Sequence, residues 1–249
     1  MNHLVMKHQS DFRLKNEIVH GKYLLERGAG EAWGWESYAG KERWARRVAM
    51  LSSHLRQGIE VLEVGCGTGY FTKELVKTNA LITAIDISPD LLEIAKSSVK
   101  SKNVLFKIEN AYSLTFGDNS FDSIVGSSVL HHLEIDRALS EFYRTLKPGG
   151  WLYFTEPNML NPQLILQKNI RFIKRKMGES PDETAFFRWG LRKRLRKYGF
   201  RNIAIRPFDF LHPQTPQPLI PLVKHIGSFL EKIPLLMEIA GSLYVKAEK

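Results

Sequence analysis

The stretch Val61-Leu-Glu-Val-Gly-Cys-Gly-Thr-Gly-Tyr-Phe-Thr72 decides the fold. The apolar run 59–64 predicts a buried strand, which leads directly into glycines at alternate positions, Gly65, Gly67 and Gly69. The segment 70–77 that follows is helix-like. A strand, a glycine turn and a helix in succession predict a nucleotide-type pocket, because glycine lets the backbone approach a ligand closely.

Two acids indicate which ligand this turn suits. Glu63 precedes the turn, and Asp86 ends the next apolar run, where an acid can accept hydrogen bonds from ribose hydroxyls. The dinucleotide fingerprint is G-x-G-x-x-G, which places a pyrophosphate on the helix N-terminus. Here the pattern is G-x-G-x-G, and the carboxylate of Glu63 would repel a pyrophosphate. The pattern favours a cationic ligand, with an ammonium or sulfonium group.

With these acids, the segment resembles motif I of the class I S-adenosylmethionine (SAM) dependent methyltransferases, most closely the type 11 group. Other stretches carry the same resemblance over residues 59–156: Asp86-Ile-Ser-Pro-Asp-Leu-Leu-Glu-Ile-Ala-Lys96, the region 109–122, Val129-Leu-His-His-Leu133 and Leu146-Lys-Pro-Gly-Gly-Trp-Leu152. The resemblance implies SAM as methyl donor, S-adenosylhomocysteine (SAH) as product and no metal.

The resemblance also implies roles for individual residues. Glu63 would face the methionine ammonium, directly or through water, while the backbone at Gly65 and Gly67 passes under the ligand. Asp86 would hold the ribose hydroxyls. The remaining implied contacts are to the adenine from Ile87, Asn110 and Ala111, and to the methionine part from Ser127.

Asn110 departs from the family pattern, which usually has aspartate at this position. That acid accepts a hydrogen bond from the adenine amino group. The carbonyl oxygen of an asparagine can still accept one, so we expect binding to survive the difference.

Methyl transfer asks little of protein side chains, because the sulfonium is an activated donor. The protein must align the reacting atoms for direct in-line transfer and exclude water. A base is needed only if the nucleophile carries a tightly held proton, and His131 is the candidate, with His132, Tyr112 and Glu156 as alternatives. The His-His pair recurs in the family as a strand-to-helix element, so a structural or substrate-shaping role is the competing hypothesis.

The order of elements predicts an α/β fold of the Rossmann-like kind. Its sheet has seven strands, is mostly parallel with an antiparallel edge strand, and carries helices on both faces. Within one structural domain we expect an N-terminal helical cap over 1–58 and a SAM-binding core over 59–156. Residues 157–249 complete the catalytic domain, with substrate-side insertions at 157–187 and 209–240.

The composition of the chain indicates the cellular compartment in which we expect the protein. Cys66 is the one cysteine, so no disulfide can form within the chain, which fits a reducing cytosol. We read Cys66 as a small filler of the turn. The sequence shows neither a secretory leader nor an apolar span of membrane length, and its histidines lack metal-site companions. We expect a cytoplasmic protein, with peripheral membrane contact as an option.

The acceptor is the open question. Of the net charge of +10, the segment 171–206 carries +9, from 12 basic and 3 acidic residues. This block favours an anionic partner or is a solvated helix face. With the apolar insertions, it leads us to prefer a small-molecule or lipid-like acceptor, to which the basic block adds the option of an anionic group. The alternatives are an RNA methyltransferase, a NAD-dependent dehydrogenase and a non-catalytic SAM-binding protein. The oligomeric state is not predicted.

Overall fold

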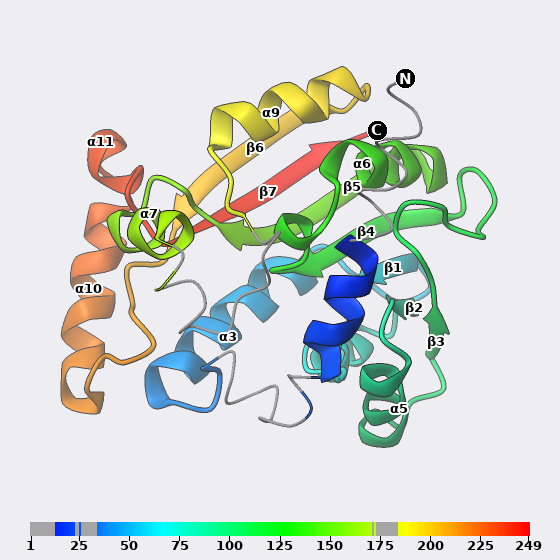
Figure 1. Cartoon of the computed structure of the whole chain (residues 1–249), viewed down its shortest axis with the longest axis horizontal. Coiled ribbons are helices and arrows are strands. Elements are labelled where there is room, and N and C mark those ends of the chain that lie inside the picture. Colours follow the sequence, from blue (N-terminus) through cyan, green and yellow to red (C-terminus); the bar gives the residue numbers. More distant parts are fainter. Residues whose placement is uncertain (1–12, 23–24, 26–33, 171, 173–183) are drawn as a thin grey trace.

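A seven-stranded sheet organises the chain, in the order β3-β2-β1-β4-β5-β7-β6 (Figure 1). The computed structural model describes residues 13–22, 25, 34–170, 172 and 184–249. The predicted Rossmann-like fold is confirmed. The strands are β1 (Glu60–Val64), β2 (Leu81–Asp86), β3 (Val104–Ile108), β4 (Phe121–Ser127), β5 (Leu146–Pro157), β6 (Arg201–Phe208) and β7 (Ser242–Glu248).

Strand direction defines one functional edge of this sheet. The first five strands are parallel to their neighbours, whereas β7 is antiparallel to both β5 and β6. Ser242, which begins β7, pairs with Pro157 at the end of β5 and with Phe208 at the end of β6. The carboxyl ends of β1 to β6 therefore share one edge with the start of β7. In open α/β sheets this edge binds ligands.

Alternate side chains of the strands bury two separate cores. On one face, Leu62 and Leu152 pack with apolar residues of α6 (Ile135–Thr145) and α9 (Arg188–Lys197). On the other face, Val61 and Tyr153 pack with α3 (Tyr38–Ser52), α5 (Pro89–Ser98) and the short α4 (Thr72–Leu75) that runs into η1 (Val76–Thr78). Helices thus cover both faces, as the sequence predicts.

The helix α3 belongs to the segment that we expect to cap the pocket. Its N-cap is Ser37, whose Oγ accepts a hydrogen bond from the N–H of Gly40 at 2.9 Å. Residues 13–22 are also helical, but 1–12, 23–24 and 26–33 lie outside the described residues. The proposed division into cap, core and insertions stays a prediction.

Further helices lie near the carboxyl ends of β5 and β6 and the start of β7 (Figure 1). None of the helices in the described part of the chain has the length and apolar character needed to cross a bilayer. These remaining elements are η2 (Leu130–His132), α7 (Pro162–Asn169), η3 (Gln217–Leu219), α10 (Ile220–Leu230) and α11 (Pro234–Met237).

The basic helix α9 lies along the sheet. It buries Leu191 and Leu195 against the core, and Arg194 and Lys197 form ion pairs with Asp136 on α6. Part of the basic block, 171 and 173–183, lies outside the described residues. The helical part of the block thus covers the sheet with its apolar side.

Candidate active site

A cavity of about 820 Å³ opens at the carboxyl edge of the sheet. Its walls come from the ends of the strands, from residues 14–21, from α3 and α7, and from the segment after β6. This volume lies in the upper part of the range for small-molecule sites. Of the site residues predicted from the sequence, the cavity wall contains Gly65, Gly67, Asp86, Ile87, Asn110, Ala111, Ser127 and His131.

The turn after β1 can only be built with glycine. Gly65 has φ +67°, in the left-handed region, and a Cβ there would come within 2.5 Å of the Cγ2 of Val129. Gly67 has φ +52°. Between them, the Cys66 side chain is 5% exposed, and burial raises the pKa of its thiol, so it stays protonated. This supports the role of Cys66 as a filler of the turn.

Asp86 is tied to the glycine turn. One of its carboxylate oxygens accepts the N–H of Gly67 at 2.8 Å and the other accepts the N–H of Ser88 at 2.9 Å. The backbone N–H of Ile87 also acts on this carboxylate, which leaves acceptor capacity on Asp86 for a ligand hydroxyl. Burial raises the pKa of Asp86 although these backbone donors lower it, and the nearby Glu17 raises it further.

Glu63 lies beneath the turn and outside the cavity wall. It is 3% exposed, and its Oε2 accepts a hydrogen bond from the Thr72 hydroxyl at 2.7 Å. Burial raises its pKa to about 7, against the hydrogen bond from Thr72, and the charge of Asp86 adds to the rise. A cation above the turn would favour the ionised form of Glu63.

The next strand ends contribute polar groups to the same end of the cavity. Asn110, after β3, accepts the N–H of Tyr112 through its Oδ1 at 2.9 Å, in a local turn. Ser127, at the end of β4, shares a hydrogen bond of 2.9 Å with the hydroxyl of Thr155. Ile87 and Ala111 supply apolar surface beside them. We call the part of the cavity lined by Gly65, Gly67, Asp86, Asn110 and Ser127 the glycine end.

His131 is fixed by a carboxylate on the neighbouring strand. Its Nδ1 lies 2.8 Å from Oε2 of Glu156, and both side chains are buried. Glu156 also accepts the backbone N–H groups of Val129 and Leu130 at 3.1 and 2.9 Å. This carboxylate therefore orients the imidazole and holds the 3₁₀ turn η2 on β5.

The other candidate bases differ from His131 in their surroundings. Tyr112 lines the cavity, but burial raises the pKa of its phenol, so it stays protonated at neutral pH. The Nδ1 of His132 lies 3.0 Å from a carboxylate oxygen of Glu17. Thus both histidines have carboxylate partners, and the two rings lie 4.2 Å apart between centroids.

The opposite end of the cavity contains charged residues that the sequence did not single out. Arg43 and Arg47, one helical turn apart on α3, both contact Asp209, which follows β6. We call this part, with Trp35 and Ser242, the arginine end. Because Arg47 and Asp209 are 162 residues apart, no local pattern reveals the pair. The available signal is arginine at i and i+4 on a predicted helix.

The described residues contain no group of three or more His, Cys, Asp or Glu side chains that could hold a metal ion. The glycine end instead fits SAM on three structural grounds. Gly65 has no room for a side chain, and Glu63 and Asp86, both raised in pKa, have no cation beside them among the described residues. Asp86 also keeps acceptor capacity for hydroxyls.

This strand order and the glycine-turn site define a Rossmann-like methyltransferase class. A family described as "Methyltransferase domain" matches residues 62–154. A crystal structure from Thermotoga maritima, described as a SAM-dependent methyltransferase and possible histamine N-methyltransferase, superposes with a TM-score of 0.66. The alignment is 22% identical and covers 91% of this chain and 98% of that one.

Curated relatives extend the match. A demethylmenaquinone methyltransferase from Tropheryma whipplei (strain Twist) is 38% identical over 150 residues, 56% of this chain and 62% of that protein. One from Staphylococcus aureus (strain JH9) is 30% identical over 186 residues, 66% of this chain and 77% of that protein. The chain thus spans about three fifths of the first of these relatives. The chain belongs to the class I SAM-dependent methyltransferases.

Proposed function

We propose that this chain transfers a methyl group from SAM to a small, lipid-like acceptor, with a demethylmenaquinone-like quinone as the first substrate to test. The observation that carries the proposal is the two-ended cavity, whose glycine end fits the donor and whose remaining volume has walls from α3, α7 and the segment after β6. The names of the curated relatives support the choice of acceptor.

The residues of the glycine end would hold the donor. When bound, SAM supplies a methyl group on a sulfonium that is already activated. Asp86 would accept the ribose hydroxyls, Asn110 and Ala111 would contact the adenine edge, and Ile87 its face. Glu63 would balance the ammonium from beneath the turn through Gly65 and Gly67, and Ser127 would contact the methionine part.

His131 is the proposed base for an acceptor that must lose a proton. Its Nδ1 is held by Glu156, and its ring lines the cavity between the two ends. A carboxylate that orients an imidazole in this way also stabilises the imidazolium formed on proton uptake. This geometry supports the catalytic hypothesis, and the substrate-shaping role is the competing one.

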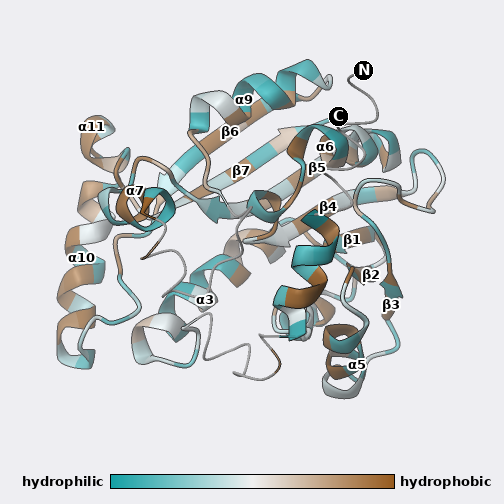
Figure 2. Cartoon of the chain, viewed as in Figure 1, coloured by the Kyte–Doolittle hydropathy of each residue, from teal (hydrophilic) through white to brown (hydrophobic). Residues whose placement is uncertain are grey.

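An apolar surface beside the cavity supports delivery of the acceptor from a bilayer. Large apolar side chains are exposed on α7 (Leu166, 57%), α10 (Leu222, 57%; Phe229, 61%) and α11 (Leu235, 84%). Figure 2 shows brown, hydrophobic stretches along α10 and α11 at one end of the molecule. A hydrogen bond from Asn161 at the start of α7 to the carbonyl of Ile239 ties α7 to the segment after α11. We propose that this surface rests on membrane lipid.

The test is incubation of the protein with isotope-labelled SAM and a whole bacterial cell extract, followed by mass spectrometry of the lipid and RNA fractions. The proposal predicts one labelled methyl group on a quinone-type lipid. Label in RNA would instead support the RNA methyltransferase alternative, and no transfer with SAH still bound would support a non-catalytic SAM-binding protein.

Membrane contact has a separate test. Flotation with vesicles should recover the wild-type protein, whereas Phe229→Glu with Leu235→Glu should leave the protein in the soluble fraction. The matched control for added negative charge is Lys100→Glu. Lys100 is exposed and lies between α5 and β3, the edge strand at the opposite end of the sheet from β6. Equal recovery of the double variant would contradict the membrane proposal.

A further inference from the structure

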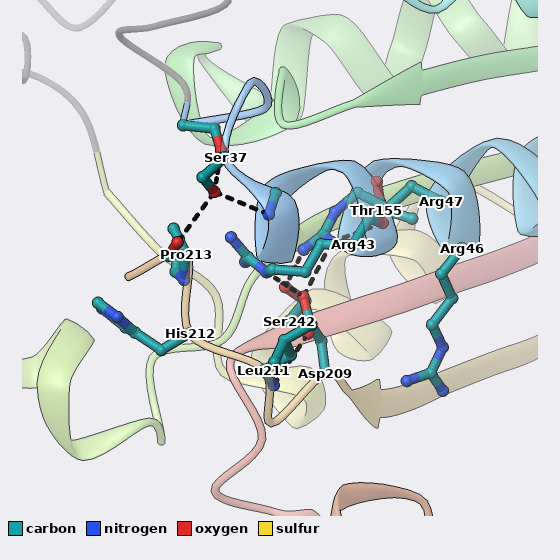
Figure 3. Close-up of polar contacts among 12 residues, drawn as sticks. Ser37, Arg43, Arg46, Arg47, Thr155, Asp209, Leu211, His212, Pro213 and Ser242 are labelled. Carbon is teal, nitrogen blue, oxygen red and sulfur yellow. Dashed lines mark hydrogen bonds and ion pairs between the residues drawn. The ribbon is translucent and has the colours of Figure 1, made fainter. Parts of the chain in front are cut away.

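The arginine end of the cavity carries more positive than negative charge. The Nε of Arg43 and the Nη1 of Arg47 each lie 2.8 Å from the same oxygen, Oδ2 of Asp209 (Figure 3). One carboxylate thus faces two guanidinium groups. The neighbouring pair of Arg46 and Glu231 is bidentate, at 2.7 and 2.6 Å, and adds no net charge.

Within the described part of the chain, several donors of this arginine pair have no hydrogen-bond partner. The Nε of Arg47 is buried and makes no hydrogen bond to a described residue. The two terminal nitrogens of Arg43 likewise make no hydrogen bond to any described residue. Buried donors are normally satisfied, so guanidinium N–H groups left over after the ion pairs with Asp209 indicate that this cavity wall can bind a further acceptor.

The two guanidinium groups are largely shielded from water, so their charges are only weakly screened. The Arg47 side chain is 4% exposed and that of Arg43 is 16% exposed. Both guanidinium groups lie over the ring of Trp35, at 5.3 and 5.8 Å from its centroid. Burial lowers the pKa of Arg47 to about 10, so it remains a cation at neutral pH.

The backbone of Asp209 is held in an unusual conformation to make this arrangement. Its φ is +79°, which non-glycine residues seldom adopt. The N–H of Leu211 donates to its Oδ1 at 3.3 Å, and the N–H of Gly241 donates to its carbonyl at 2.8 Å. Strained residues held in this way cluster at ligand sites.

The sheet order separates this end from the glycine turn. Gly65 follows β1 and Asp209 follows β6, and β4, β5 and β7 lie between these strands. Four strand intervals of about 4.8 Å correspond to roughly 19 Å across the sheet. Asp209 therefore lies on the side of the cavity away from Asp86. The arginine pair extends from α3 between the two, over Trp35, whose ring centroid lies 6.2 Å from that of Phe71 after the glycine turn.

We propose that Arg43 and Arg47 form an anion-binding subsite for the methyl acceptor, which carries an anionic oxygen group. Carboxylate, phosphate and the ionised hydroxyl of a phenol-type ring all match the forked donors of arginine. The inference rests on the proposed function, because it assigns the occupant of the second end of the same cavity. Arg43 is a binding residue, and Asp209 positions the pair.

The test is calorimetric titration of small ring anions into the full chain saturated with SAH. Each anion is compared with a neutral partner of similar shape: benzoate with benzamide, phenyl phosphate with phenyl acetate, and 4-nitrophenolate with 4-nitroanisole. Arg43→Gln removes the charge, Arg43→Lys keeps it without the fork, and Lys41→Gln removes an exposed charge from the same helix.

The wild type and Lys41→Gln should bind at least one anion more tightly than its neutral partner, and the anion that binds identifies the oxygen group. Arg43→Gln should weaken that anion about tenfold or more, Arg43→Lys should weaken it less, and SAH affinity should be unchanged in all variants. No preference for any anion with SAH still bound would overturn the subsite and leave the proposed function standing. Loss of SAH in Arg43→Gln alone would assign the pair to the donor carboxylate and overturn the inference. Failure of the wild type to bind SAH would overturn the proposed function.

Discussion

The two ends of the cavity have opposite imbalances of charge. The glycine end holds Glu63 and Asp86, whose pKa values are raised because burial removes water and the described residues supply no cation. The arginine end holds Asp209, whose pKa is lowered because Arg47 and Arg43 outweigh the effect of burial. One end is thus short of positive charge and the other has it in excess. A cationic donor and an anionic acceptor would complete the two ends.

The largest expected effect is the loss of the carboxylate that holds the arginine end together. Asp209→Asn leaves Arg43 and Arg47 as buried neighbours of like charge, so the free energy of unfolding should fall by about 3–5 kcal/mol. Urea unfolding measures this. The control, Glu42→Gln, breaks an exposed pair with Lys224 and should cost less than about 1 kcal/mol. Equal effects in both variants would mean that the arginine end contributes no more than a surface pair.

The second prediction asks whether His131 acts as a base in methyl transfer. His131→Ala should slow single-turnover methyl transfer by about 100-fold, the usual range for loss of a general base, with little change in SAH affinity. The exposed His225→Ala on α10 is the matched control. A rate equal to that of the wild type would remove the base and leave the substrate-shaping role.

At the glycine end, adding a single Cβ atom at Gly65 should disturb the conformation of the turn. Gly65→Ala places a Cβ against Val129 and forces alanine to φ +67°, so SAH should bind about thirtyfold more weakly, equivalent to about 2 kcal/mol. Gly58 is a suitable control because it has φ +81° but open space around its Cα. Gly58→Ala should therefore pay only the backbone strain and bind SAH normally. Weakened binding in both variants would point to general destabilisation.

The smallest effect is a pH dependence at Glu63. Its folded pKa of about 7 lies above the ordinary value of 4.5, so the folded state holds the proton more tightly. Stability therefore falls as pH rises from about 4.5 to 7. In ligand-free protein, wild type should lose about 1 kcal/mol between pH 6 and pH 8 relative to Glu63→Gln. Parallel pH profiles for the two proteins, measured by urea unfolding, would show that Glu63 is ionised throughout.

The same contrast explains what the sequence can reveal. The glycine turn, Asp86 and Asn110 lie at the ends of consecutive strands, so a short motif and the alternation of elements predict their convergence. Helix α3 (Tyr38–Ser52) lies within 1–58, the segment in which we expect helices that cap the pocket.

The arginine end could not be predicted in this way. Arg43 meets Asp209 across 166 residues, and only the placement of β6 beside β7 brings them together. The basic segment drew attention to an anionic partner, yet its helix α9 packs along the sheet with Leu191 and Leu195 buried. The excess positive charge within the cavity comes instead from Arg43 and Arg47 on α3.

The most direct test of the account is calorimetric titration of SAM into the wild-type protein at pH 6 and pH 8, alongside Asp86→Ala. We predict one molecule bound per chain, tighter binding at pH 8 because Glu63 ionises, and a loss of affinity of about 100-fold in Asp86→Ala. Absence of binding by the wild type, or equal binding by Asp86→Ala, would contradict the assignment of the glycine end to the methyl donor.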